Sequence, residues 1–155
     1  MDARTQRLLR SLQDPDEAVR EQATAELWHD WFHQKGKPLA QELFQSQSLL
    51  ESGQTQAVES LLNRVIDNHP DFAEAWNRRA VLYYMQSQYR KAIADCETVV
   101  ARIPYHFGAL HGLGLCQAAI GDYPAAIRAF REALSVQPFS LTNQRLILEC
   151  TARLS

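Results

Sequence analysis

The sequence predicts an all-α protein in which helical hairpins stack into a solenoid. Prolines stand at Pro70, Pro104 and Pro138, so they recur at an even interval of thirty-four positions, and the residues before them repeat with the same period. A repeat of this length is typical of helix–turn–helix units, none of which buries its apolar face alone. Neighbouring units therefore have to pack on one another, and the curved stack that results has a concave side.

Each repeat is expected to contain two helices, because its apolar residues recur at the spacing of one helix face. Trp76, Ala80 and Tyr83 fall at positions i, i+4 and i+7. The equivalent positions of the next repeat keep large residues opposite large ones and small opposite small, with one polar exception at Gln117. The small residues Ala80 and Gly114 let paired helices approach closely. Proline closes each unit, since it lacks the N–H that would carry the second helix onward.

The segment before the repeats predicts a separate helical hairpin. Asp14 and Pro15 stop a first helix, and Asp16 and Glu17 suit the positive end of the next one. That second helix carries a broad apolar stripe made of Val19, Ala23, Leu27, Trp31 and Phe32. We interpret the hairpin as a cap that covers the first repeat, because the terminal repeats of a solenoid need a covered inner face and a polar outer one.

The chain resembles the tetratricopeptide-repeat family. Residues 73–104 and 107–138 carry its pattern of tryptophan or leucine, small residue, tyrosine, alanine, aromatic, alanine and proline. Residues 39–70 form a degenerate third copy, with polar residues in the first helix at Glu42, Gln45 and Ser46. The hairpin at 8–27 is similar to a HEAT repeat with its aspartate-proline-aspartate turn. AEAWNRRA and HFGALHGLG also look like stretches of bacterial and plastid tetratricopeptide proteins.

These resemblances imply a right-handed α-solenoid that forms a single domain over residues 1–155. Its expected parts are a HEAT-like hairpin cap (1–36), a degenerate first repeat (39–72), a second repeat (73–106), a third repeat (107–139) and an amphipathic capping helix (140–155).

The resemblance also implies which residues line the concave wall. In each first helix, a second stripe lies one residue beyond the residues that face the stack. The expected groove residues are Leu43, Gln47, Asn77, Arg78, Val81, Tyr84, Met85, His111 and Leu115. The stripe is mostly apolar, and its aromatic and methionine side chains adapt to a ligand, so an amphipathic helix or an extended apolar segment is the natural guest. Two alternatives stay open: the chain's own helices cover the stripe, or Arg78 and Arg79 are ordinary solvated residues.

One known ligand class is disfavoured. Family members that hold the carboxylate terminus of heat-shock chaperones use lysine, arginine and asparagine at fixed groove positions. Those positions here carry Leu43, Gln47, Arg78, Gly108 and Gly112. Without the fixed cations, a terminal carboxylate lacks its charge-assisted hydrogen bonds.

Composition narrows the function further. The net charge of the chain is −2, whereas nucleic-acid-binding proteins usually carry an excess of basic residues, so nucleic-acid binding is disfavoured. The apolar runs are too short for a bilayer span, and the stretch MDARTQRLLR has no signal-peptide core, which favours a cytoplasmic protein without direct membrane insertion. Cys96, Cys116 and Cys150 sit in apolar helical patterns and are expected to be buried thiols.

No catalytic, metal or cofactor site is expected. His29 and His33 lie one turn apart and offer two metal ligands without a third. Cys116 and His111 are five positions apart and face different sides of their helix, which disfavours a nucleophile–base pair. We therefore expect a non-catalytic scaffold that binds a helix or extended peptide of an unidentified protein partner. The alternative is a homo-oligomerising assembly factor that uses its end helices.

Overall fold

The computed structural model describes residues 1–154, which form nine α-helices and no strand, so the all-α prediction is confirmed. The helices are α1 Ala3–Ser11, α2 Glu17–Phe32, α3 Lys37–Glu51, α4 Thr55–Asn68, α5 Ala73–Met85, α6 Tyr89–Arg102, α7 Phe107–Ala119, α8 Tyr123–Val136 and α9 Leu141–Ala152.

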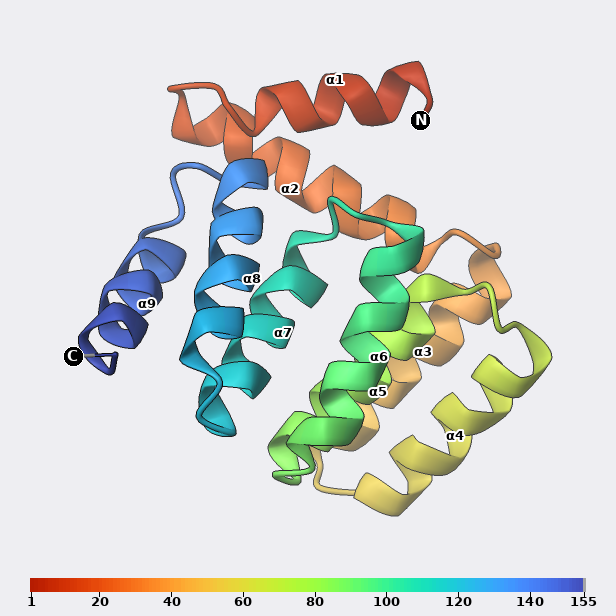
Figure 1. Cartoon of the computed structure of the whole chain (residues 1–155). Helices are drawn as coiled ribbons and strands as arrows, with labels where there is room; N and C mark the ends of the chain where they lie inside the picture. Colours follow the sequence, from red (N-terminus) through yellow and green to blue (C-terminus); the bar gives the residue numbers. More distant parts are fainter. Residues whose placement is uncertain (155) are drawn as a thin grey trace.

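Helices α3 to α8 form three antiparallel hairpins that lie side by side (Figure 1). Each helix packs against the next one in the chain, and the first helices α3, α5 and α7 also contact one another. The first helices therefore form one layer, and the second helices α4, α6 and α8 form the other.

The turn between the two helices of each repeat uses a left-handed backbone residue. Gly53, Ser87 and Gly121 occupy the same position of their repeats and have φ values of 79°, 59° and 84°. Glycine adopts this conformation without strain, whereas a residue with a Cβ atom does so at a cost of about 1–2 kcal/mol. The packing of the repeat thus imposes the left-handed turn conformation even at Ser87, which is not a glycine.

Small residues control how closely the helices of one repeat approach, as the spacing predicts. A Cβ atom on Gly114 would lie 2.5 Å from Cε1 of Phe130, a fully buried ring on α8. At the equivalent positions of the preceding repeat, Ala80 packs in one cluster with the smaller Cys96. The larger side chain on one helix is therefore matched by the smaller one on its partner.

Helix α9 continues the repeat register as the first helix of a further unit. Ser140, which caps α9, stands one repeat period after His106, which caps α7. Helix α9 packs on α8, and His111 of α7 forms a 2.8 Å hydrogen bond with Asn143 of α9. The outer face of α9 is open, with Leu148 71% exposed.

The N-terminal hairpin differs from the expected end cap. Its turn is as predicted, with the Asp16 side chain accepting the N–H of Ala18 at 2.9 Å. The hairpin, however, lies across the ends of the repeats (Figure 1). Its apolar stripe packs on Phe107 and, at the end of α8, on Val136. Only the C-terminal end of α2 reaches the first repeat, where Phe32 joins the core of α3, α4 and α5.

The physical reason for this placement is a vacancy at the start of α7. A Cβ atom on Gly108 would lie 2.4 Å from Cη2 of Trp28, so the missing side chain makes room for the indole of α2. Trp28 also packs edge-on against the rings of Trp31, Phe32 and Phe107. Trp28 packs against both the core of the first repeat and the cluster that contains Phe107 of the third repeat.

Candidate functional site

The layer of first helices has one surface that stays open below α2. On α3 and α5 it exposes large apolar side chains, among them Phe44, Tyr84 (39% exposed) and Met85 (60% exposed). Two pockets lie on this surface, one beside α2 and one beside α9. Large exposed apolar side chains grouped on one face are typical of a binding surface.

The first pocket, which we call the Arg78 pocket, lies between α2, α3 and α5. It has a volume of about 470 Å³ and is lined by Ala25, Trp28, His29, Phe32, Phe44, Gln47 and Arg78. The majority of these residues come from α2. The added hairpin therefore builds a wall of the site that the repeats alone do not supply.

The second pocket, which we call the α9 pocket, lies between α5, α7, α8 and α9. It has a volume of about 520 Å³. Its lining is Tyr84, Leu115, Ala118, Ala119, Tyr123, Leu146, Glu149, Cys150, Ala152 and Arg153. The small residues of α7 leave a hollow, while Tyr84 and Leu146 provide apolar walls.

The structure brings most of the predicted groove residues to this surface but not all of them. Gln47 and Arg78 line the Arg78 pocket, and Tyr84 and Leu115 line the α9 pocket. Met85 is exposed beside them.

Four of the predicted groove residues are less open. Val81 and His111 are half-buried, and His111 is engaged with Asn143. Leu43 is fully buried in the cluster that contains Phe32 of α2. Asn77 is buried and donates to Glu74. The open alternative that the chain's own helices cover the stripe therefore applies at Leu43 and Asn77, which are both buried.

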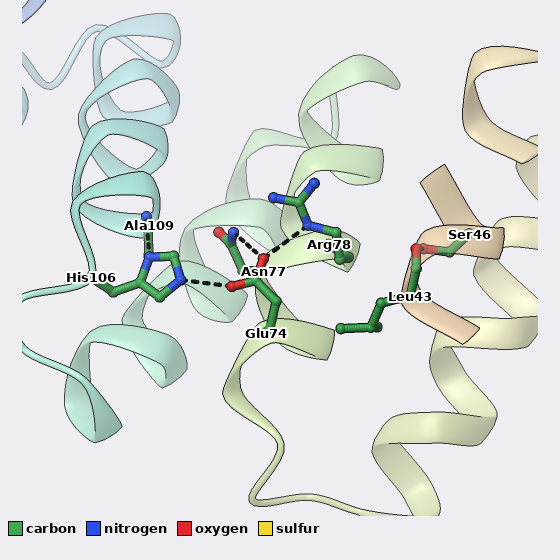
Figure 2. Close-up of polar contacts among 7 residues, drawn as sticks. All are labelled: Leu43, Ser46, Glu74, Asn77, Arg78, His106 and Ala109. Carbon is green, nitrogen blue, oxygen red and sulfur yellow. Dashed lines mark hydrogen bonds and ion pairs between the residues drawn. The ribbon is translucent and has the colours of Figure 1, made fainter. Parts of the chain in front are cut away.

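A buried polar network underlies the Arg78 pocket (Figure 2). The carboxylate of Glu74 is fully buried and accepts three hydrogen bonds: from Asn77 at 2.9 Å, from Nε of Arg78 at 3.0 Å and from Nε2 of His106 at 2.8 Å. Nδ1 of His106 in turn accepts the backbone N–H of Ala109 at 3.0 Å, which caps α7. Since Nδ1 is an acceptor, Nε2 is the nitrogen of His106 that donates to Glu74.

The network holds Glu74 in its ionised form. Burial by itself raises the pKa of this carboxyl. The contacts with His106, Arg78 and Asn77 outweigh burial, so the pKa of Glu74 is lower than its ordinary value. Trp31 stacks on the His106 ring, with centroids 3.9 Å apart. The network thus ties α5 and α7 to α2.

Of the arginine pair, only Arg78 belongs to the open surface. Arg79 points to the second helices, where its guanidinium donates two hydrogen bonds to Asp95, at 2.8 Å and 2.9 Å, and one to Asn63 at 3.0 Å. A bidentate pair of this kind stabilises the stack. The solvated interpretation is therefore wrong for Arg79.

Sequence reasoning missed Glu74, His106 and Trp28 as parts of the site. Glu74 and His106 belong to different helical hairpins and share no local motif. Their position in the sequence could have indicated that they belong to the site. Each lies at the start of a first helix, and Gly108 beside them leaves space for a large side chain. The sequence analysis did not link Trp28 to these two residues, because it did not predict that α2 runs past the start of α7.

The pair of potential metal ligands at the end of α2 gains no third ligand in the described structure. His29 and His33 stack on each other with centroids 4.0 Å apart, and residues 1–154 contain no cluster of three potential metal ligands. Cys96, Cys116 and Cys150 are buried, as predicted. Residues 1–154 include no helix whose length and hydropathy would allow it to span a bilayer.

Comparisons with known proteins agree with this geometry. The family model "Tetratricopeptide repeat" matches residues 71–138. A TPR repeat-containing protein of Rhizobium etli is 34% identical over 98 residues, which are 63% of this chain and 48% of that protein. The chain thus spans about half the length of this relative.

Two solved structures share the fold. The first TPR domain of Spaghetti (RPAP3), bound to the HSP90 peptide SRMEEVD, has a TM-score of 0.71 and 16% identity over 73% of this chain and 90% of that one. MamA from Desulfovibrio magneticus RS-1 has a TM-score of 0.68 and 21% identity, and the match covers 99% of this chain and 86% of that one. The family match and the repeat pattern show that residues 71–138 carry tetratricopeptide repeats, and the described residues share the fold of tetratricopeptide-repeat domains.

Proposed function

We propose that the chain is a non-catalytic scaffold whose open surface of first helices binds a helix or extended segment of a partner protein. Tetratricopeptide repeats form extended concave binding surfaces, and the Spaghetti domain of the same fold holds a peptide. The single observation that carries the proposal is the position of α2. This helix of the chain itself packs against the ends of the first helices through Trp28 and Phe32, so apolar side chains of a helix fit beside the open surface.

The part of the surface beyond α2 offers the same kind of contact to a second helix. Tyr84 and Met85 are exposed at the end of α5, and Tyr84 lines the same pocket as Ala118 and Ala119. Fully burying a large apolar side chain contributes about 1.5–3 kcal/mol. Since Tyr84 and Met85 are partly buried already, we expect the two together to contribute about 2–3 kcal/mol to binding, or roughly a 30- to 150-fold change in Kd.

The test is affinity capture of partners from native lysate with the double variant Tyr84→Ala, Met85→Ala. Val19→Ala is the control, because Val19 is exposed on the hairpin away from both pockets. We expect the double variant to lose partners that the parent protein and the control retain. An unchanged set of partners would exclude this surface.

Self-association through α9 is a second candidate, and a different observation favours it. Leu148 occupies the repeat position that Ala80 and Gly114 hold in α5 and α7, and both of those positions are covered by the second helix of their repeat. On α9 no helix within residues 1–154 covers Leu148, which together with Leu141 leaves an apolar stripe open. Light scattering over a concentration series tests this candidate: a dimer that Leu148→Glu dissociates supports it, and a monomer at every concentration contradicts it.

A further inference from the structure

We propose that the Arg78 pocket binds the side-chain carboxylate of an aspartate or glutamate in the partner segment, next to an apolar partner residue. This inference rests on the proposed function and specifies the chemistry of one of its two pockets. It follows from how the guanidinium is held, from which of its nitrogens are free and from what surrounds it.

The guanidinium is fixed before any ligand arrives. Its Nε donates to the fully buried carboxylate of Glu74 at 3.0 Å. The guanidinium carbon lies 5.7 Å from the ring centroid of Trp28 and 5.4 Å from that of Phe32, within the range of cation–π contact. A side chain held in this way loses little conformational entropy when it binds a ligand.

The terminal nitrogens of Arg78 remain available. Neither forms a hydrogen bond to any of residues 1–154, and in Figure 2 they point away from Glu74. The side chain is 19% exposed, so a ligand in the pocket reaches it. A planar guanidinium presents these N–H groups as a fork that matches the two oxygens of a carboxylate.

The charges around the Arg78 pocket favour a ligand group that carries one negative charge. Glu74 shares its charge among three donors, so it neutralises the guanidinium only in part. None of the described residues that line the pocket is acidic. A phosphate dianion would place two charges on one cation that already has a carboxylate behind it, and this favours the carboxylate as ligand.

The walls of the pocket specify the neighbour of that carboxylate. Phe44 is exposed and stacks on Phe32 with centroids 4.9 Å apart, which presents an aromatic face beside the guanidinium. An aliphatic or aromatic partner residue covers this face. The site differs from a clamp for a chain terminus, because it has one cation and because α2 builds part of its wall.

Two synthetic tripeptides test the inference: N-acetyl-Leu-Glu-Phe-amide and its Gln analogue, which differ only in the carboxylate. Binding to the full chain is measured by NMR from the Nε–H signal of Arg78 and the indole N–H signal of Trp28. A charge-assisted hydrogen-bond pair contributes about 1.5–3 kcal/mol, so the Glu peptide is expected to bind at least tenfold more tightly than the Gln peptide.

Three variants separate a direct contact from a structural effect. Arg78→Gln removes the cation and is expected to abolish the preference for the Glu peptide. Gln47→Glu changes an exposed residue at the pocket, leaves the network intact and is expected to weaken the Glu peptide through charge repulsion. Arg64→Gln, on the outer helix α4, is the control and should leave the preference unchanged.

Loss of the preference in Arg78→Gln, or its weakening in Gln47→Glu, supports the inference. Equal binding of the two peptides, or a preference that survives both changes, would overturn it while leaving peptide binding at the surface intact. If a phosphoserine peptide binds more tightly than the Glu peptide, the inferred carboxylate ligand is wrong and phosphate is the ligand instead. Absence of any shift at Arg78 and Trp28 would overturn the inference, and unchanged partner capture by the Tyr84 and Met85 variant would separately reject the proposed function.

Discussion

Substitution of Gly114 by alanine tests the packing that defines each repeat. An added Cβ would meet the Phe130 ring at 2.5, 2.7 and 2.8 Å, and the ring is fully buried, so it has no room to move. Overpacking of this kind costs about 1–3 kcal/mol, and alanine in place of glycine in a helix gains about 1 kcal/mol. We therefore expect Gly114→Ala to lower the free energy of unfolding by about 1 kcal/mol.

Gly112 provides a matched control in the same helix. Its added Cβ would lie 3.5 Å from Sγ of Cys96, an ordinary van der Waals contact. Gly112→Ala is therefore expected to gain up to about 1 kcal/mol from helix propensity, a result of opposite sign. Urea unfolding followed by circular dichroism measures both variants. Adding Phe130→Leu to Gly114→Ala should recover part of the loss; equal stability of the two alanine variants would refute the close approach.

Three further predictions concern the turn, the buried carboxylate and the thiols. Ser87→Gly relieves the left-handed conformation at φ 59° and should raise the free energy of unfolding by about 1 kcal/mol; a lower Tm would contradict this. The lowered pKa of Glu74 means that its ionised form stabilises the fold above the ordinary carboxyl pKa, and that this contribution disappears as pH falls through the folded value. Glu74→Gln should therefore be less stable at neutral pH and flatter in acid titration than the parent, and parallel profiles would contradict this. Burial raises the pKa of Cys116 to about 11 and raises those of Cys96 and Cys150, so Ellman's reagent should modify these thiols only after unfolding.

The parts of the fold that were predictable from sequence are those set by local, periodic constraints. The spacing of the prolines identifies the repeats because every unit packs against the next in the same way. The close approach at Gly114 was predictable because a small residue acts on its immediate surroundings. The aspartate-proline-aspartate turn similarly marks where α2 begins.

The course of α2 was not predictable, because it depends on contacts between segments far apart in the chain. Trp28 of the hairpin meets Gly108 of the third repeat, and no period relates the two. The course of α2 changes the candidate site, because α2 adds a wall beside Arg78. The remaining predicted groove residues follow the register of the first helices, and their role in binding stays a prediction.

The most direct test of the binding surface is photo-crosslinking from the surface itself. A photoreactive phenylalanine analogue replaces Tyr84 on the open face, or Gln56 on the outer face of α4, and each protein is irradiated in native lysate. The proposed function predicts a discrete protein adduct from position 84 and none from position 56. An adduct from position 56 alone, or equal labelling from both positions, would contradict it.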